Sequence, residues 1–133
     1  MAIEKILTGS IDLSKATKLK DVTLVSERYP RFIASTLKTV TPDHRNLRQI
    51  TVFTTDILYS MDSNPHNQKT TRAEWLGLDS VFIKLWESHS IHPKVQYDLP
   101  SLMDAEKVRQ SVESLFPETT RREVVDLSIR ELF

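Results

Sequence analysis

Two histidines three residues apart, His89 and His92, have the spacing that best suits a metal ion in this chain. Imidazole nitrogens bind divalent metals such as Zn²⁺, but a zinc site in a protein needs more than two ligands. The sequence has no cysteine, and the nearest carboxylates are Glu87 and Asp98. Both histidines follow a predicted helix, where the helix dipole favours a cationic side chain without any metal. The sequence therefore predicts no metal site and no cofactor.

Serines and carboxylates are frequent, but no pattern selects a catalytic group among them. There is no Gly-x-Ser-x-Gly segment to expose a nucleophilic serine. Asp98 and Asp104 could support acid–base chemistry, although Ser101-x-x-Asp104 is also typical of a helix start. With only Gly9 and Gly77, the chain cannot form a glycine-rich phosphate loop. A non-catalytic function is favoured, and an enzyme is left open.

The composition is that of one ordinary globular domain of 133 residues. Eighteen basic residues balance eighteen acidic ones, which argues against a nucleic-acid partner. No apolar run approaches the roughly 18 residues that cross a bilayer, and the first ten residues lack the apolar core of a signal peptide. The lack of cysteine is typical of intracellular proteins. We therefore expect a cytoplasmic protein without a membrane partner.

Hydrophobic periodicity switches repeatedly between the period of a strand and that of a helix. It predicts a helix beginning at Pro30, a second opened by the capping box Thr71-Arg-Ala-Glu74, and a third over residues 102–116. Trp75 and Trp86 lie on one face of the second helix, which favours a place in the core, rather than a partner contact, for at least one of them. A terminal helix over 122–132 competes with the last strand. The predicted strands are residues 22–25, 47–53, 94–99 and 123–129.

This alternation predicts parallel strands joined by right-handed crossovers. Either an open doubly wound sheet or a one-sided stack satisfies it. Leu19-x-x-Val22-x-Leu24 and Leu47-x-x-Ile50-x-Val52 repeat an L-x-x-L-x-L pattern, which favours the stack. The predicted fold is α/β: a short leucine-rich-repeat-like stack with about four parallel strands and helices mainly on one face. Residues 1–133 form one such domain, with a loop insertion at about 55–70.

Four segments carry a resemblance to a known group: IDLSKATKLKDVTLV, TLKTVTPDHRNLRQITV, WLGLDSVFIKLWESHSIHPKV and LFPETTRREVVDLS. They resemble the C-terminal region of uncharacterised leucine-rich-repeat-like proteins of mushroom-forming fungi, some of which carry an F-box. The resemblance implies a repeat architecture and a protein-recognition role, and it implies no catalytic residue. No F-box-like segment precedes Ile11, so we expect a standalone relative or part of a longer protein.

In such a stack, the residues between the core positions face the open side of the sheet. We predict a protein-binding face there, with Val25 and Phe53 as apolar spots in a polar surround. A merely solvated face is the alternative interpretation, and an inert cap of a longer repeat protein is another. The exposed ends of the stack could also bind a second copy. The predicted face consists of Asp21, Thr23, Val25, Gln49, Thr51, Phe53, Gln96, Asp98, Asp126 and Ser128.

A doubly wound sheet would instead place a small-ligand or hydrolytic site beyond the carboxyl ends of its strands. That alternative requires helices on both faces of the sheet. Its candidate residues are Ser26, Glu27, Arg28, Thr54, Thr55, Asp56, Asp98 and Ser101.

Overall fold

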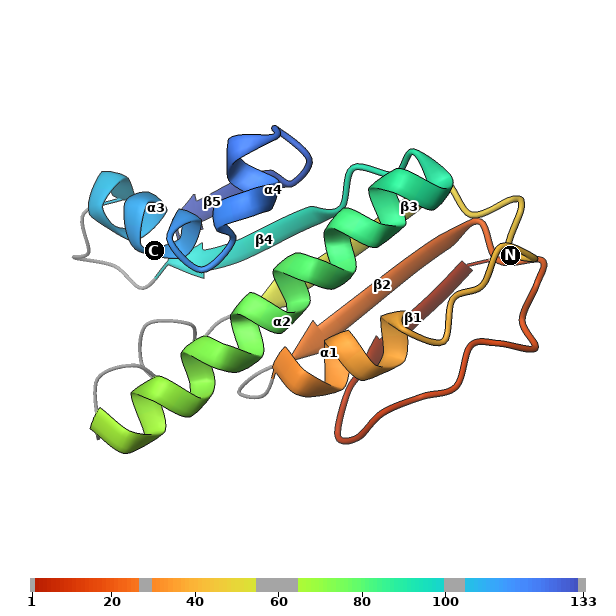
Figure 1. Ribbon diagram of the computed structural model, residues 1–133, viewed down its shortest axis with the longest axis horizontal. Coiled ribbons are helices and arrows are strands. Elements are labelled where there is room, and N and C mark those ends of the chain that lie inside the picture. The colour runs from red at the N-terminus through yellow and green to blue at the C-terminus, as the bar shows by residue number, and fades with distance from the viewer. Residues whose placement is uncertain (1, 27–29, 55–64, 100–104, 132–133) are drawn as a thin grey trace.

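The computed structural model describes residues 2–26, 30–54, 65–99 and 105–131. Five strands and four helices occupy these residues (Figure 1). None of these helices is long and apolar enough to span a bilayer. In chain order, the elements are β1 (Ala2–Ile6), β2 (Asp21–Ser26), α1 (Pro30–Leu37), β3 (Gln49–Thr54), α2 (Pro65–His89), β4 (Lys94–Leu99), α3 (Ala105–Glu113), α4 (Pro117–Arg121) and β5 (Asp126–Glu131).

The sheet is entirely parallel, and its spatial order β1-β2-β3-β4-β5 is the order of the chain. The two L-x-x-L-x-L segments pair as the repeat predicts, with Val22 beside Ile50 and Leu24 beside Val52. Because successive right-handed crossovers in one direction put every helix on the same face, this order produces a one-sided stack. Figure 1 shows α1, α2 and α4 on the same side of the sheet. The parallel α/β stack is therefore confirmed, and the doubly wound alternative is wrong.

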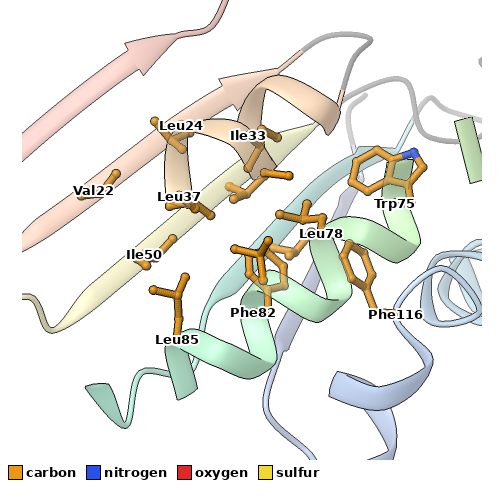
Figure 2. Packing of buried hydrophobic residues seen from close by; sticks show 14 of the residues in the cluster. Val22, Leu24, Ile33, Leu37, Ile50, Trp75, Leu78, Phe82, Leu85 and Phe116 are labelled. Carbon is orange, nitrogen blue, oxygen red and sulfur yellow. The ribbon is translucent and has the colours of Figure 1, made fainter. Parts of the chain in front are cut away.

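One hydrophobic core lies between the sheet and the helices. In Figure 2, Leu37 of α1 and Leu85 of α2 lie with Ile50 of β3 in this layer. Trp75 is 3% exposed, and its ring meets that of Phe116 edge-on at 5.7 Å. Trp75 and Phe116 therefore belong to the core, as predicted for at least one of the two tryptophans, whereas Trp86 is half-buried. The helices contribute to this single cluster Ile33, Ala34, Leu37, Trp75, Leu78, Val81, Phe82, Leu85, Val108 and Val112.

Several element boundaries differ from the prediction. Strand β1 was not predicted at all, so the sheet has five strands rather than four. Helix α2 begins at Pro65, before the predicted start at Thr71, so residues 65–70 are helical rather than loop. Residues 55–64, the rest of the predicted insertion, lie outside the described residues, as does the predicted Ser101–Asp104 cap. Proline is well suited to a first helical turn because it lacks only an N–H that has no partner there.

The same property of proline explains the end of the chain. Helix α3 ends at Glu113, and Pro117 begins the short helix α4 instead of only terminating its predecessor. Strand β5 confirms the predicted fourth strand, shifted to Asp126–Glu131, and the competing terminal helix is wrong.

The connection between β1 and β2 contains no helix. Polar side chains from α1 and the segment after it bind the backbone of this connection by hydrogen bonds. The hydroxyl of Thr36 accepts a hydrogen bond from the Ile11 N–H at 3.0 Å, and that of Thr39 accepts one from the Leu13 N–H at 2.8 Å. Buried His44 accepts from the Thr41 N–H at Nδ1, 3.0 Å away, so Nε2 donates to the Leu13 carbonyl at 2.7 Å. These bonds give side-chain acceptors to the N–H groups of Ile11, Leu13 and Thr41, and such backbone groups need a partner when they lie beside a core.

Candidate protein-binding face

The side of the sheet opposite the helices, here called the open face, gathers all ten residues predicted for it. Along β3, half-buried Gln49, Thr51 and Phe53 alternate with buried Ile50 and Val52. The same alternation holds in β2 and β4, as expected when helices cover one face of a sheet. None of the ten residues is buried: Asp126 is exposed, and the others are half-buried. Among the described residues, no helix packs on this face.

The strand register arranges the open face into rows that cross the sheet. One row, here called the apolar row, joins Ile6, Val25 and Phe53, which are direct neighbours across β1, β2 and β3. It continues into Gln96 of β4 and Ser128 of β5. Ile6 is 69% exposed and is one of the two exposed large hydrophobic residues in the described chain. The two predicted apolar spots are thus one continuous strip that reaches the edge of the sheet.

A polar row lies beside the apolar row. It runs from Glu4 through the two threonines of β2 and β3 to Lys94 and Asp126. Charged groups therefore stand at both ends of the row, and hydroxyl groups stand at its middle. The face combines an apolar strip with a polar surround, which is the composition typical of a protein-binding surface. In register order, this row is Glu4, Thr23, Thr51, Lys94 and Asp126.

Two carboxylates of the face are bound by arginines of adjacent segments. Arg130 donates to both oxygens of Asp98, at 3.1 and 3.2 Å, and this pair joins β4 to β5. Arg48 donates to both oxygens of Asp21 at 3.3 Å. Exposed ion pairs of this kind contribute little to stability, but the forked geometry fixes the orientation of both groups. These carboxylates therefore present an oriented polar rim rather than free acid–base groups.

The two histidines considered as metal ligands, His89 and His92, each contact a backbone carbonyl oxygen instead. His89 Nε2 lies 3.2 Å from the Thr41 carbonyl, and its Nδ1 lies 2.6 Å from the Ser88 hydroxyl. His92 Nδ1 lies 3.0 Å from the Val124 carbonyl. Within the described parts of the chain, no three histidine or carboxylate side chains come together as a metal site would require.

The residues of the enzyme alternative are not gathered into a described site. Ser26 and Thr54 are register neighbours at the carboxyl ends of β2 and β3, and Thr54 is buried. Asp98 lies on the open face in its pair with Arg130. With strands in uninterrupted chain order, the sheet has no switch point to open a crevice between them. The remaining candidates lie outside the described residues: Glu27, Arg28, Thr55, Asp56 and Ser101.

The shifted pKa values belong to exposed groups away from the open face. A hydrogen bond from Arg121, at 2.6 Å, lowers the pKa of Glu118, and the charges of Arg121 and Arg122 act in the same direction. The same pair raises the pKa of Arg121. Hydrogen bonds from Ser14 lower the pKa of Asp12 in the β1–β2 connection. These shifts stabilise charged surface groups and do not create a general acid or base.

Sequence reasoning missed Glu4 and Ile6 because it missed β1, and it also missed Lys94 and Arg130. A signal for β1 existed. It begins 19 residues before β2 (21 − 2 = 19), close to the roughly 20–29-residue repeat that the rest of the chain suggested. The two charges in the middle of Ala2–Ile6 hid that signal.

Comparison with known proteins adds nothing to these features. No family model matches the chain, and neither a curated protein nor a solved structure is significantly similar to it. The open face is therefore the feature from which a function is inferred.

Proposed function

We propose that this chain is a non-catalytic protein-binding module and that its open face receives the partner. The observation that carries the proposal is the apolar row, in which Ile6, Val25 and Phe53 lie side by side on a face that none of the described helices covers. A partly exposed apolar strip with a polar rim is suited to a protein surface that presents its own apolar side chain at the centre.

Charge indicates how that partner is oriented. The β1 end of the polar row carries Glu4, and the β4 strand carries Lys94. A partner with a basic group near β1, an apolar anchor over Val25 and Phe53, and hydrogen-bonding groups over the threonines would match the face. The balanced charge of the whole chain, eighteen basic against eighteen acidic residues, favours a protein over a nucleic acid as partner.

The family resemblance and the cellular location are part of the same proposal. We propose that the chain is a leucine-rich-repeat-like protein, and parallel strands in chain order support this interpretation. A cysteine-free sequence supports an intracellular and cytoplasmic location.

The test is a comparison of three proteins: the unmodified chain, the double variant Thr51→Arg/Phe53→Asp, and the control Leu76→Asp. Leu76 is 39% exposed on α2, so its replacement is a similar change on the helical side. Each protein is used to capture partners from an extract, with circular dichroism as a check of folding. The captured candidate is then purified, and its affinity for each protein is measured by calorimetry.

We expect the purified partner to bind the unmodified chain and the control equally. The double variant should lose at least about tenfold in affinity, because it adds two charges and removes the central aromatic ring. A partner that binds the folded double variant as tightly as the unmodified chain would refute the open face as the binding site.

A further inference from the structure

The two edges of the sheet differ in their chemistry. On the helical side of β1, Lys5 is exposed and Ile3 is half-buried, so a charged residue ends the apolar layer there. On the helical side of the β5 end, Val125, Leu127 and Ile129 form an apolar stripe. All three are only partly buried, although they pack against the core. The apolar layer therefore continues to the β5 edge.

Within the described ranges, β5 is an edge strand, and one side of its backbone has no neighbouring strand. The Asp126 N–H donates to the Pro93 carbonyl at 2.9 Å, so the backbone groups of Asp126 point toward β4. Alternate residues of a strand direct their N–H and C=O groups to opposite sides. The backbone N–H and C=O groups of Leu127 and Ile129 consequently point away from β4. Among the described residues, no strand lies beyond β5 to pair with them. Such an edge is a template for another strand.

We propose that this edge binds a second copy of the chain, β5 against β5, about a two-fold axis perpendicular to the sheet. Antiparallel pairing centred on Ile129 sets Ile129 against itself, Leu127 against Glu131, and Ser128 against Arg130. No two groups of like charge oppose one another, and Arg130 keeps its internal partner Asp98. The helical layers of the two copies lie on the same side of the joined sheet, so the two Ile129 side chains of the apolar stripes meet at the axis.

The other edge pairings are less favourable in charge. The Leu7 N–H donates to the Val25 carbonyl, so Ala2, Glu4 and Ile6 have the outward backbone groups of β1. An antiparallel β1–β1 pairing that uses all three opposes Glu4 to Glu4. In a head-to-tail assembly, β5 of one copy pairs with β1 of the next. If this pairing continues the strand register of the sheet, Asp126 of one copy lies beside Glu4 of the other. Like charges directly opposite are destabilising in a sheet, so charge complementarity selects the β5–β5 dimer.

Sedimentation equilibrium over a series of protein concentrations tests the dimer. We expect the unmodified chain to dimerise, and Ile129→Lys to weaken dimerisation at least about tenfold because two ammonium groups then meet at the axis. The matched control, Ile6→Lys on the β1 edge, should dimerise normally. The double variant Thr51→Arg/Phe53→Asp should also dimerise, which separates this proposal from that of the open face.

Cysteine cross-linking keeps the test valid if Ile129→Lys fails to fold. The chain has no cysteine, so Ile129→Cys and Ile6→Cys each carry a single thiol. In a hydrogen-bonded antiparallel pair the opposed Cα atoms are about 5.5 Å apart, a separation that a disulfide spans. Mild oxidation should cross-link Ile129→Cys and not Ile6→Cys. A chain that stays monomeric at all concentrations, or equal cross-linking at the two edges, would overturn the proposal.

Discussion

Asp79 is a buried carboxylate, and its removal tests whether a contact between distant parts of the chain stabilises the fold. It belongs to α2, is 4% exposed, and accepts three hydrogen bonds from the start of α4. The donors are the Glu118 N–H at 3.2 Å, the Thr119 N–H at 3.0 Å and the Thr119 hydroxyl at 2.7 Å. Phe116, at the N-cap position of α4, makes no side-chain capping bond. Asp79 therefore caps this helix from a distant part of the chain.

The expected cost of Asp79→Ala follows from the groups it leaves without partners. Loss of a helix cap typically costs about 1 kcal/mol. The buried Thr119 hydroxyl adds about 1–3 kcal/mol when it loses its main acceptor, since only the Phe116 carbonyl at 3.4 Å remains. The free energy of unfolding should fall by about 2–4 kcal/mol. Thr119→Val removes one donor and should cost less.

Urea denaturation of the single and double variants measures these values. Asp79→Ala should lower the midpoint by about 1–2 M, whereas Asp43→Ala, the removal of an exposed aspartate, should change stability by less than about 0.5 kcal/mol. The double-mutant cycle should show a coupling of about 1 kcal/mol or more between Asp79 and Thr119. If Asp79→Ala costs no more than Asp43→Ala, or if the two buried substitutions are simply additive, the long-range cap has no energetic importance.

Three further predictions concern other parts of the chain. His44→Ala should cost about 2–4 kcal/mol in urea denaturation, because it removes the acceptor of the Thr41 N–H and one of the two donors to the Leu13 carbonyl, and it opens a cavity; a loss under 1 kcal/mol would show that His44 is dispensable there. Gly77→Ala should raise the melting temperature by about 3–5 °C, since a Cβ at this exposed helical position meets nothing within 4 Å; an unchanged or lower value would contradict this. In an NMR titration, the carboxyl of Glu118 should have a lowered pKa, and Arg121→Gln should raise it. The ionised carboxylate thus stabilises the fold above its ordinary pKa, and this contribution is lost as the pH falls through the lowered folded value; an identical pKa in both proteins would refute the role of Arg121.

The parallel stack was predictable because the repeated spacing of its core residues favours a stack over the doubly wound sheet that the alternation of strands and helices also allows. Val22 and Ile50 occupy equivalent places in the two L-x-x-L-x-L segments, and they pair in the sheet. Once that pairing is set, side-chain alternation decides which residues face away from the helices. The ten residues of the predicted face follow from this argument, and each of them lies on the open face.

What sequence reasoning could not supply were features set by distant contacts. Lys5 occupies a helical-side position in β1, where the pattern of a strand would place an apolar residue. A strand at the edge of a sheet tolerates this charge because water reaches it, so periodicity alone does not reveal β1. The cap of α4 by Asp79 joins residues about 40 positions apart, and no local pattern encodes such a bond. Both features depend on which segments become neighbours.

Because the strands lie in chain order, each strand contributes its own short stretch of sequence to the open face. Each row takes one residue from each successive strand, so Thr23 and Thr51 stand side by side although 28 positions divide them (51 − 23 = 28). Their neighbours in sequence, Val22 and Val52 among them, point the other way into the core. Randomising Thr23, Val25, Thr51 and Phe53 together would thus diversify one compact patch while leaving every interior side chain intact. The domain is in this respect a natural scaffold for a binding library, encoded in two short cassettes.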